Sequence, residues 1–276
     1  MIYRYIGGKS KAAIQKQIQS LAPKTYKEFR EPFVGGGSTF FNIDQSIPRW
    51  INDLDTNLIS VYLSLRDRYD QFIALCQEIE PHTKEESVPP PIYNKRMRDI
   101  FYKMIDDDVD PALKYYFVNR VGFSGRVRYD IRSRLYFSNP SGWNIIKTDK
   151  LKKASEILQN TKITCGSYFD LMFGQGLQGE DVWIYIDPPY YKNTLLTESS
   201  KLYAHNFTEN DHLNLAANLK YCKHKFLLSY DNCDFIKNLY KDFEIIEADW
   251  TYCGTSSAKG QSKTKKVGQE LFIKNY

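Results

Sequence analysis

Seven short segments of the chain are rich in β-branched, aromatic and other apolar residues and are bounded by turn-forming residues. Several of them lack the alternation of polar and apolar positions that a half-exposed strand shows, which favours a mostly parallel sheet buried on both faces. The segments lie at about residues 26–33, 49–52, 162–168, 182–186, 225–230, 243–247 and 270–274.

Between these segments, apolar residues recur at helical spacing. One such pattern covers residues 9–20 and another covers residues 57–76. A third begins at Thr208, whose spacing to Asp211 is that of a capping box. Because strands and helices alternate at both ends of the chain, the sequence predicts an α/β fold with a Rossmann-like, doubly wound sheet.

The middle of the chain has a different character. It shows a helical pattern at residues 93–105 and an Arg-, Gly- and Ser-rich stretch at 120–144, but no strong strand pattern. We therefore predict one domain formed by residues 1–58 and 150–276, interrupted by an inserted, largely helical subdomain at residues 59–149. A single domain is the alternative that the chain length also allows.

Composition narrows the class of protein. The chain is 42% hydrophobic and 26% charged, and no run approaches the ~20 apolar residues of a membrane span. Its first residues contain no export signal, so we expect a cytoplasmic protein without a membrane partner. The five cysteines form no CxxC pair and the four histidines no metal-site pattern, so we expect reduced cysteines and no metal.

Basic residues gather in two stretches. Five arginines lie between Arg120 and Arg134 against one acid, and four lysines lie between Lys259 and Lys266. The formal net charge of +5 is only a mild indication of a polyanionic partner. From charge alone, a solvated surface explains either stretch as well as contact with nucleic acid does.

The most informative motif is Asp187-Pro188-Pro189-Tyr190, directly after the apolar segment 182–186. Two prolines cannot continue a central strand, so the chain leaves the carboxyl edge of the sheet, where open α/β sheets bind ligands, in a stiff loop. The Asp187 carboxylate and the Pro188 carbonyl can accept both N–H bonds of an exocyclic amine on an aromatic base, and Tyr190 can stack on that base. Such a site directs the nitrogen lone pair at a methyl sulfonium, and Asp187 or water can take the released proton. A structural Pro-Pro turn is the alternative.

A glycine-rich loop, residues 31–38, follows the first predicted strand. Its glycines let the backbone approach a ligand closely. The spacing Gly35-Gly36-Gly37 is not G-x-G-x-x-G and no P-loop lysine follows, which argues against a dinucleotide or a nucleoside triphosphate. Asp53 ends the next short strand, where an acid can bind the two ribose hydroxyls of NAD or S-adenosylmethionine. The motif at 187–190 favours S-adenosylmethionine.

With these motifs in place, the chain resembles the Dam-type (alpha-class, D12) family of DNA adenine N6-methyltransferases over nearly its whole length. Residues 5–9 resemble the segment that wraps the methionine end of the cofactor, and residues 206–212 and 265–271 also resemble family segments. The resemblance implies a class I methyltransferase fold and methyl transfer from S-adenosylmethionine to N6 of an adenine flipped out of double-stranded DNA. It assigns catalysis to Asp187, Pro188, Pro189 and Tyr190, and cofactor binding to Tyr5, Lys9, Glu31, Phe33, Gly35, Gly36, Gly37, Asp53, Ser167, Tyr168 and Asp187.

Two departures from the family pattern change what is expected. Ser167 stands where many relatives carry an Asp that binds the amine of the cofactor adenine; a backbone carbonyl or Asp170 can substitute. In the segment that resembles the DNA-reading loop, Arg128 fits the specificity arginine, whereas Arg126 replaces an apolar residue of members that recognise GATC. We therefore expect another recognition sequence. The DNA-binding residues that the resemblance implies are Arg120, Ser124, Arg126, Arg128, Lys263, Lys265 and Lys266.

Other functions stay open at this point. N4-cytosine methylation is one, because the same motif can serve either amine. Asp187 argues against RNA and protein-amide methyltransferases, which more often carry Asn there. A protein that keeps the fold and binds DNA without turnover is an alternative of another class. The resemblance implies a monomer, and the sequence leaves open whether a restriction endonuclease is its partner.

Overall fold

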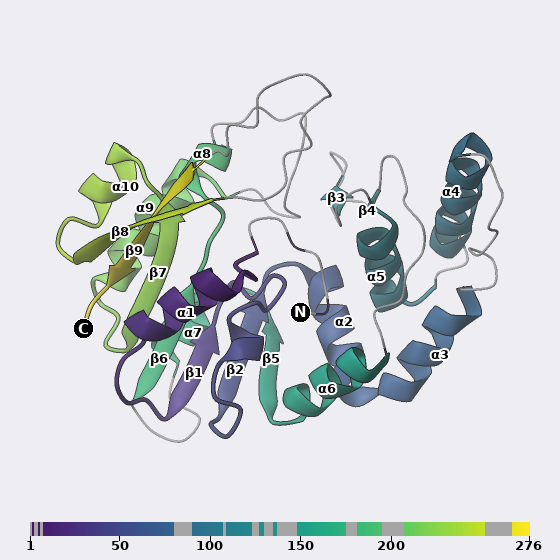
Figure 1. Cartoon of the computed structure of the whole chain (residues 1–276), viewed down its shortest axis with the longest axis horizontal. Coiled ribbons are helices and arrows are strands. Elements are labelled where there is room, and N and C mark those ends of the chain that lie inside the picture. Colours follow the sequence, from purple (N-terminus) through teal and green to yellow (C-terminus); the bar gives the residue numbers. More distant parts are fainter. Residues whose placement is uncertain are drawn as a thin grey trace.

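The computed structural model describes residues 2, 5, 8–79, 90–106, 109–122, 127–129, 135–136, 148–174, 181–194, 207–251 and 267–276. Its centre is a seven-stranded sheet with the order β5-β2-β1-β6-β7-β9-β8 (Figure 1). Strands β5, β2, β1, β6 and β7 are parallel, β9 is antiparallel to β7, and β8 is antiparallel to β9. These strands are β1 (Glu28–Glu31), β2 (Arg49–Asp53), β5 (Thr161–Cys165), β6 (Val182–Ile186), β7 (Lys225–Asp231), β8 (Glu244–Thr251) and β9 (Val267–Lys274). The predicted mostly parallel, doubly wound sheet is confirmed.

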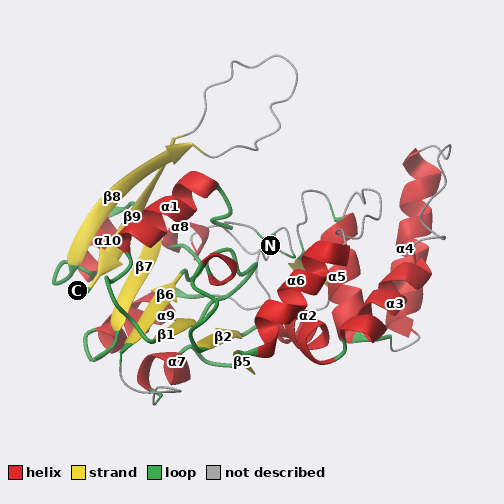
Figure 2. Cartoon of the chain, turned by 60° about the horizontal axis from the view of Figure 1, so that its bottom comes forward, coloured by secondary structure: helices red, strands yellow, loops and turns green. Residues whose placement is uncertain are grey.

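Helices cover both faces of this sheet and extend to one side of it (Figure 2). They are α1 (Ala12–Leu21), η1 (Phe40–Asn42), α2 (Thr56–Asp67), α3 (Tyr69–Ile79), α4 (Pro90–Asp106), α5 (Pro111–Val121), α6 (Thr148–Gln159), α7 (Phe169–Phe173), α8 (Tyr191–Thr194), α9 (Glu209–Leu219) and α10 (Asp234–Leu239). A two-stranded antiparallel pair, β3 (Arg128–Tyr129) and β4 (Leu135–Tyr136), lies between α5 and α6 in the sequence. Among the described residues, no helix has both the length and the apolar character needed to cross a membrane.

Strand β6 explains why the sheet is buried on both faces. Trp183 and Tyr185 pack into one hydrophobic cluster, which also contains residues of α1 and α2. The alternate residues Ile184 and Ile186 pack into a second cluster with residues of α7, α9 and α10. Because helices cover both faces, every position of this strand is buried, and a polar and apolar alternation is absent.

The prediction of one continuous helix at residues 57–76 is wrong. The structure divides it into α2 and α3 at Arg68, whose φ of −149° is not helical. The Arg68 guanidinium contacts the Asp110 carboxylate and donates to Ser64 Oγ at 2.8 Å, so the break places α3 beside α5. The capping box at Thr208 is confirmed, since Thr208 and Asp211 exchange side-chain-to-backbone hydrogen bonds at the start of α9.

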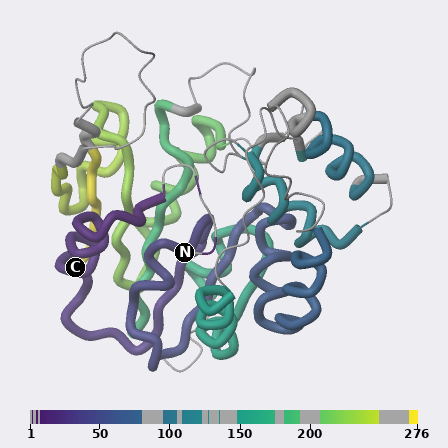
Figure 3. The backbone as a smooth tube through the Cα atoms, turned by 45° about the vertical axis from the view of Figure 1, so that its right-hand side comes forward, coloured from purple at the N-terminus to yellow at the C-terminus, as the bar shows by residue number. Residues whose placement is uncertain are grey.

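The middle of the chain lies to one side of the sheet. Helices α3, α4 and α5 gather on the side of the molecule away from β8 and β9 (Figures 1 and 3). Helix α2, in which the predicted domain boundary falls, packs against β2 and β5. The division into two domains therefore stays a prediction.

The strand order reverses between β1 and β6, and this places the two most informative motifs together. From β1 the chain continues to β2 on one side, whereas β6 continues to β7 on the other. The glycine loop follows β1, and residues 187–190 follow β6. Both loops leave the same carboxyl edge at the switch point, where doubly wound sheets bind ligands.

The buried ion pair of Arg30 and Glu28 on β1 should contribute to the stability of the fold, which can be tested. Arg30 Nε lies 2.6 Å from Glu28 Oε1, and Arg30 Nη1 donates to the carbonyls of Leu171 and Gly174. Arg30→Met removes the cation that lies 2.6 Å from the buried Glu28 carboxylate, so urea denaturation should show a loss of about 3–5 kcal/mol in the free energy of unfolding. Lys220→Met breaks an ion pair between half-exposed side chains and should not change that free energy measurably. Equal effects of the two substitutions would show that burial of the Arg30 pair does not determine its contribution to stability.

Candidate active site

A cavity of about 360 Å³ opens at the switch point between β1 and β6. Its walls come from the N-terminal segment, from the loops after β1, β2, β5 and β6, and from the start of α9. The predicted site residues that line it are Tyr5, Lys9, Glu31, Phe33, Gly35, Gly36, Asp53, Ser167, Tyr168, Asp187, Pro188, Pro189 and Tyr190. Segments far apart in the sequence are therefore brought together at one cavity of a size that small ligands occupy.

The glycine loop needs glycine at two positions. Gly35 and Gly37 have φ values of +44° and +65°, which other residues rarely adopt. A Cβ atom at Gly35 would lie 2.7 Å from the Tyr5 ring, and one at Gly37 would lie 2.8 Å from the hydroxyl of Tyr62. Gly37 does not line the cavity, so it shapes the loop against α2 rather than facing a ligand.

Asp53, at the end of β2, fixes this loop from the neighbouring strand. Its Oδ2 accepts the N–H of Gly35 at 2.9 Å, and its Oδ1 accepts the N–H of Asp55 at 3.1 Å. Burial raises the pKa of Asp53 to about 6, although these backbone donors oppose the shift. At neutral pH the cavity thus holds a partly desolvated carboxylate next to the glycine loop.

Glu31 is a second buried carboxyl group at the same edge. It is 2% exposed, and its Oε2 accepts the N–H of Phe40 at 2.8 Å. Burial, together with the nearby Asp187 and Asp53, raises its pKa well above the usual range. The cavity therefore brings several carboxyl groups together, and a ligand with positive charge would favour their ionised form.

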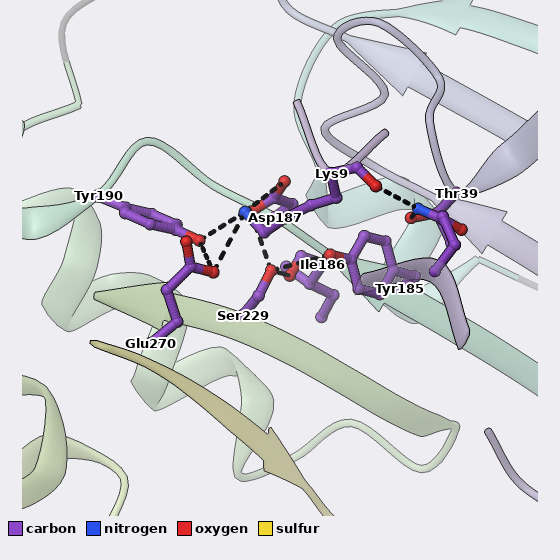
Figure 4. A network of polar contacts seen from close by, with 9 residues as sticks. Lys9, Thr39, Tyr185, Ile186, Asp187, Tyr190, Ser229 and Glu270 are labelled. Carbon is purple, nitrogen blue, oxygen red and sulfur yellow. Dashed lines mark hydrogen bonds and ion pairs between the residues drawn. The ribbon is translucent and has the colours of Figure 1, made fainter. Parts of the chain in front are cut away.

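Asp187 and Tyr190 belong to a connected network of buried and partly buried polar groups (Figure 4). Lys9 Nζ lies 3.0 Å from Asp187 Oδ1 and 2.5 Å from the hydroxyl of Tyr190. The Tyr190 hydroxyl donates to Glu270 Oε2 at 2.6 Å, and Ser229 Oγ donates to Asp187 Oδ1 at 2.8 Å. Burial lowers the pKa of Lys9, but the Asp187 and Glu270 carboxylates outweigh that effect and raise it above its ordinary value. Lys9 is therefore a protonated cation beside the predicted catalytic carboxylate.

Aromatic side chains form the other end of the cavity. The ring of Phe33 lies 5.4 Å from the ring of Tyr168, and 5.9 Å, at 84°, from the ring of Phe207. The hydroxyl of Tyr168 accepts a hydrogen bond from Asn218 of α9 at 3.3 Å. This arrangement offers apolar faces for a flat ring.

Ser167 does not substitute directly for the acid that the family pattern places there. Its Oγ accepts the N–H of Phe169 at 3.2 Å, which is a local turn at the start of α7. Asp170 does not line the cavity, whereas Asp211 does. Asp211 Oδ2 is held by the backbone and hydroxyl of Thr208, and within the described chain no donor reaches its Oδ1.

Sequence reasoning missed Phe207, Asp211, Ser229 and Glu270 as site residues. Phe207 and Asp211 lie in the segment 206–212, and Glu270 lies in the segment 265–271, both noted above only as resembling the family. The capping box was a signal for Asp211, because it places that residue at a helix N-terminus. Nothing in the sequence pointed to Ser229, since the pairing of β7 with β6 brings it to Asp187.

The predicted DNA-binding residues are only partly described. Arg120 is 7% exposed in the last turn of α5, which is not the exposure of a side chain that faces phosphates. Arg128 belongs to β3, in register with Tyr136 of β4. Ser124, Arg126, Lys263, Lys265 and Lys266 lie outside the described residues. Their contact with DNA stays a prediction.

Metal and histidine chemistry find no support in the described parts of the chain. No group of His, Cys, Asp or Glu side chains there is arranged to hold a metal ion. His212 is buried beside the Tyr230 hydroxyl, 2.6 Å from its Nδ1, and burial lowers its pKa to about 4. His212 is thus a neutral structural residue.

Comparison with known proteins identifies one family, and two relatives match this chain over nearly their whole length. The family model described as D12 class N6 adenine-specific DNA methyltransferase matches residues 5–253. Type II methyltransferase M1.LlaDCHI of Lactococcus lactis subsp. cremoris is 30% identical over 290 residues, which cover 99% of this chain and 94% of the relative. Type II methyltransferase M.MjaIII of Methanocaldococcus jannaschii is 28% identical, with 99% and 98% covered. The DNA adenine methylase of Escherichia coli K12 is 30% identical over 191 residues, with 67% and 64% covered.

Proposed function

The chain belongs to the D12 class of N6 adenine-specific DNA methyltransferases, and we propose that the cavity between β1 and β6 is where it methylates adenine. S-adenosylmethionine is the methyl donor and double-stranded DNA the substrate. The observation that supports this location most directly is that Asp187 and Asp53 line the same cavity, one after β6 and the other at the end of β2. A base-binding carboxylate and a ribose-binding carboxylate then face one space.

The polar and aromatic groups of the cavity fit the donor. Phe33 and Tyr168 offer apolar faces to the adenine ring, and Asp53 accepts hydrogen bonds from the ribose hydroxyls. When bound, S-adenosylmethionine supplies a methyl group on a positively charged sulfur, and the Asp187 carboxylate is complementary to such a charge. Lys9 points at Asp187 in this structure, so its contact with the methionine carboxylate stays a sequence-based prediction.

Asp187 and the two prolines orient the target amine. The lone pair of an exocyclic amine is delocalised into the ring, so the nitrogen is a weak nucleophile until its N–H bonds are held. The carboxylate of Asp187 and the carbonyl of Pro188 accept these two N–H bonds, and Tyr190 stacks on the base. After the new N–C bond forms, the nitrogen becomes acidic and gives its proton to Asp187 or water.

The target adenine has to leave the duplex to reach this cavity, which costs a few kcal/mol. Basic side chains that hold the phosphates offset this cost, and the stretches at 120–134 and 259–266 are our candidates. Arg128 is proposed to recognise guanine and Lys265 to bind phosphate. The Type II relatives favour a partnership with a restriction endonuclease, and the loop residues favour a recognition sequence other than GATC.

The first test replaces the proposed catalytic carboxylate. Asp187→Ala should reduce methyl transfer by about a thousandfold, because the amine loses both its orienting acceptor and a proton acceptor. Expression in a host free of DNA methylation, followed by mass spectrometry of the nucleosides, measures N6-methyladenine. Asp181→Ala, at the other end of β6, breaks the pair with Lys225 and should methylate normally. Full activity of Asp187→Ala, or methylcytosine as the product, would contradict the proposal.

The second test uses the raised pKa of Asp53. A carboxylate accepts ribose hydroxyls best when ionised, so affinity for S-adenosylmethionine should be full above about pH 6 and fall as pH drops through that value. We expect binding about tenfold weaker at pH 5 than at pH 8 by isothermal titration calorimetry. Because Glu31, Asp55 and Cys165 also face Asp53, Asp53→Asn is the control. Asp53→Asn should bind S-adenosylmethionine weakly and with an affinity that does not change with pH. If its affinity changes with pH as much as that of the native protein, another group causes the effect.

The third test concerns the group that binds the donor's adenine amine. Asp211 lines the cavity. We propose that its carboxylate binds the donor's adenine amine, which Ser167 cannot do as the family's Asp does. Asp211→Ala should raise the Kd for S-adenosylmethionine about tenfold through loss of a partly buried hydrogen bond. Thr208→Ala removes the same helix cap but keeps the Asp211 carboxylate, so it should lower the melting temperature similarly and raise the Kd less than Asp211→Ala does. Equal Kd values for the two variants would refute the assignment.

A further inference from the structure

Glu270, on β9, is a buried carboxylate that the proposed mechanism does not yet use. It is 1% exposed and lies 80 residues beyond the motif at 187–190. Its Oε2 accepts the hydroxyl hydrogen bond of Tyr190 at 2.6 Å and lies 3.5 Å from Lys9 Nζ. Figure 4 shows it beside Tyr190, across the network from Ser229. A carboxyl group that is buried this completely stays ionised only when hydrogen bonds and ion pairs compensate for the lost hydration.

Lys9 connects Glu270 with the proposed catalytic carboxylate. The ammonium carries three N–H bonds, and its acceptors include Asp187, the Tyr190 hydroxyl and Glu270. Lys9 is 2% exposed, so water screens these interactions little. One positive charge is therefore shared between two carboxylates that come from different strands.

Asp187 has to bind the amine of the base, but its oxygens already have partners. Oδ1 accepts Ser229 Oγ at 2.8 Å and Lys9 Nζ at 3.0 Å, and Oδ2 accepts Lys9 Nζ at 3.3 Å. The amine can take Oδ2 if Lys9 withdraws from that oxygen. In a site poor in water, an ammonium leaves one carboxylate readily only toward another negative group. Glu270 is such a group, and the Tyr190 hydroxyl lies between it and Lys9.

We propose that Glu270 is a positioning residue for methyl transfer, which keeps Lys9 and Tyr190 in place while Asp187 binds the amine of the flipped adenine. The inference rests on the proposed function of the cavity. Glu270 itself touches neither the base nor the donor, and acts through Lys9 and Tyr190. Without its negative charge, the ammonium is drawn more strongly to Asp187 and competes with the amine.

Glu270→Gln tests this inference, because it keeps the shape and an acceptor for the Tyr190 hydroxyl but loses the charge. The single-turnover rate of methyl transfer, at saturating donor and duplex DNA, should fall about tenfold or more. The Kd for S-adenosylmethionine, measured without DNA by isothermal titration calorimetry, should stay within about threefold of the native value. An unchanged rate, or a raised Kd with an unchanged rate, overturns the proposal.

A double-mutant cycle separates positioning from a general loss of packing. Tyr190→Phe removes the hydroxyl that joins Lys9 to Glu270, so Tyr190→Phe with Glu270→Gln should be no more than about threefold slower than the slower single variant. Rate losses that multiply overturn the proposal. Glu270→Asp keeps the charge and should be faster than Glu270→Gln; the opposite order also overturns it, even if Glu270→Gln folds poorly.

Glu244→Gln is the matched control. It is the same substitution on the adjacent strand β8, where Glu244 pairs with Lys274 at the surface, and it should leave both rate and Kd unchanged. If the native protein forms no N6-methyladenine, the proposed function fails. If the native protein is active and Glu270→Gln matches its rate, only the role of Glu270 is wrong.

Discussion

The buried ammonium of Lys9 is the interaction on which the site depends. It joins the N-terminal segment to Asp187 after β6 and to Glu270 on β9. Lys9 and Glu270 are almost fully buried, and each would destabilise the fold by several kcal/mol if it lost its charged partners. Their mutual attraction therefore requires that all three segments are in place together. The proposed catalytic site therefore includes Lys9 of the N-terminal segment as well as residues 187–190.

The order of the strands supplies the remaining supports of this motif. Strand β7 lies next to β6, and its residues Ser229 and Asp231 point the same way because they are two positions apart. Ser229 holds the carboxylate of Asp187, and Asp231 accepts the N–H groups of Tyr191 and Lys192 at 2.9 and 3.2 Å. The loop is thus fixed at both ends by one strand, while two prolines stiffen its middle. A rigid acceptor suits a reaction that depends on the direction of a nitrogen lone pair.

Hydrophobic pattern and motif spacing predicted the sheet well, because strands buried on both faces, such as β6, carry apolar residues throughout. The capping box at Thr208 could also be predicted from the sequence, because it depends on residues that are close together in the chain. The break at Arg68 could not, because Arg68 pairs there with Asp110, a residue distant in the sequence. Glu270 was missed as a site residue for the same reason. A charged residue in a strand looks like an exposed position until the pairing of β9 with β7 places it opposite Asp231 and below the catalytic loop.

The carboxyl groups of the cavity also bear on how a ligand is held and released. Burial raises the pKa of Asp53 to about 6 and that of Glu31 well above its usual range. The stability that such groups contribute is present below their unfolded pKa values and is lost as pH rises through the folded ones, so ionisation of these groups at neutral pH opposes folding. A cationic ligand offsets this unfavourable effect, and a neutral one does not. In the proposed mechanism, methyl transfer removes the sulfonium charge and with it an attraction to Asp53 and Asp187, which favours exchange of the spent donor for a fresh one.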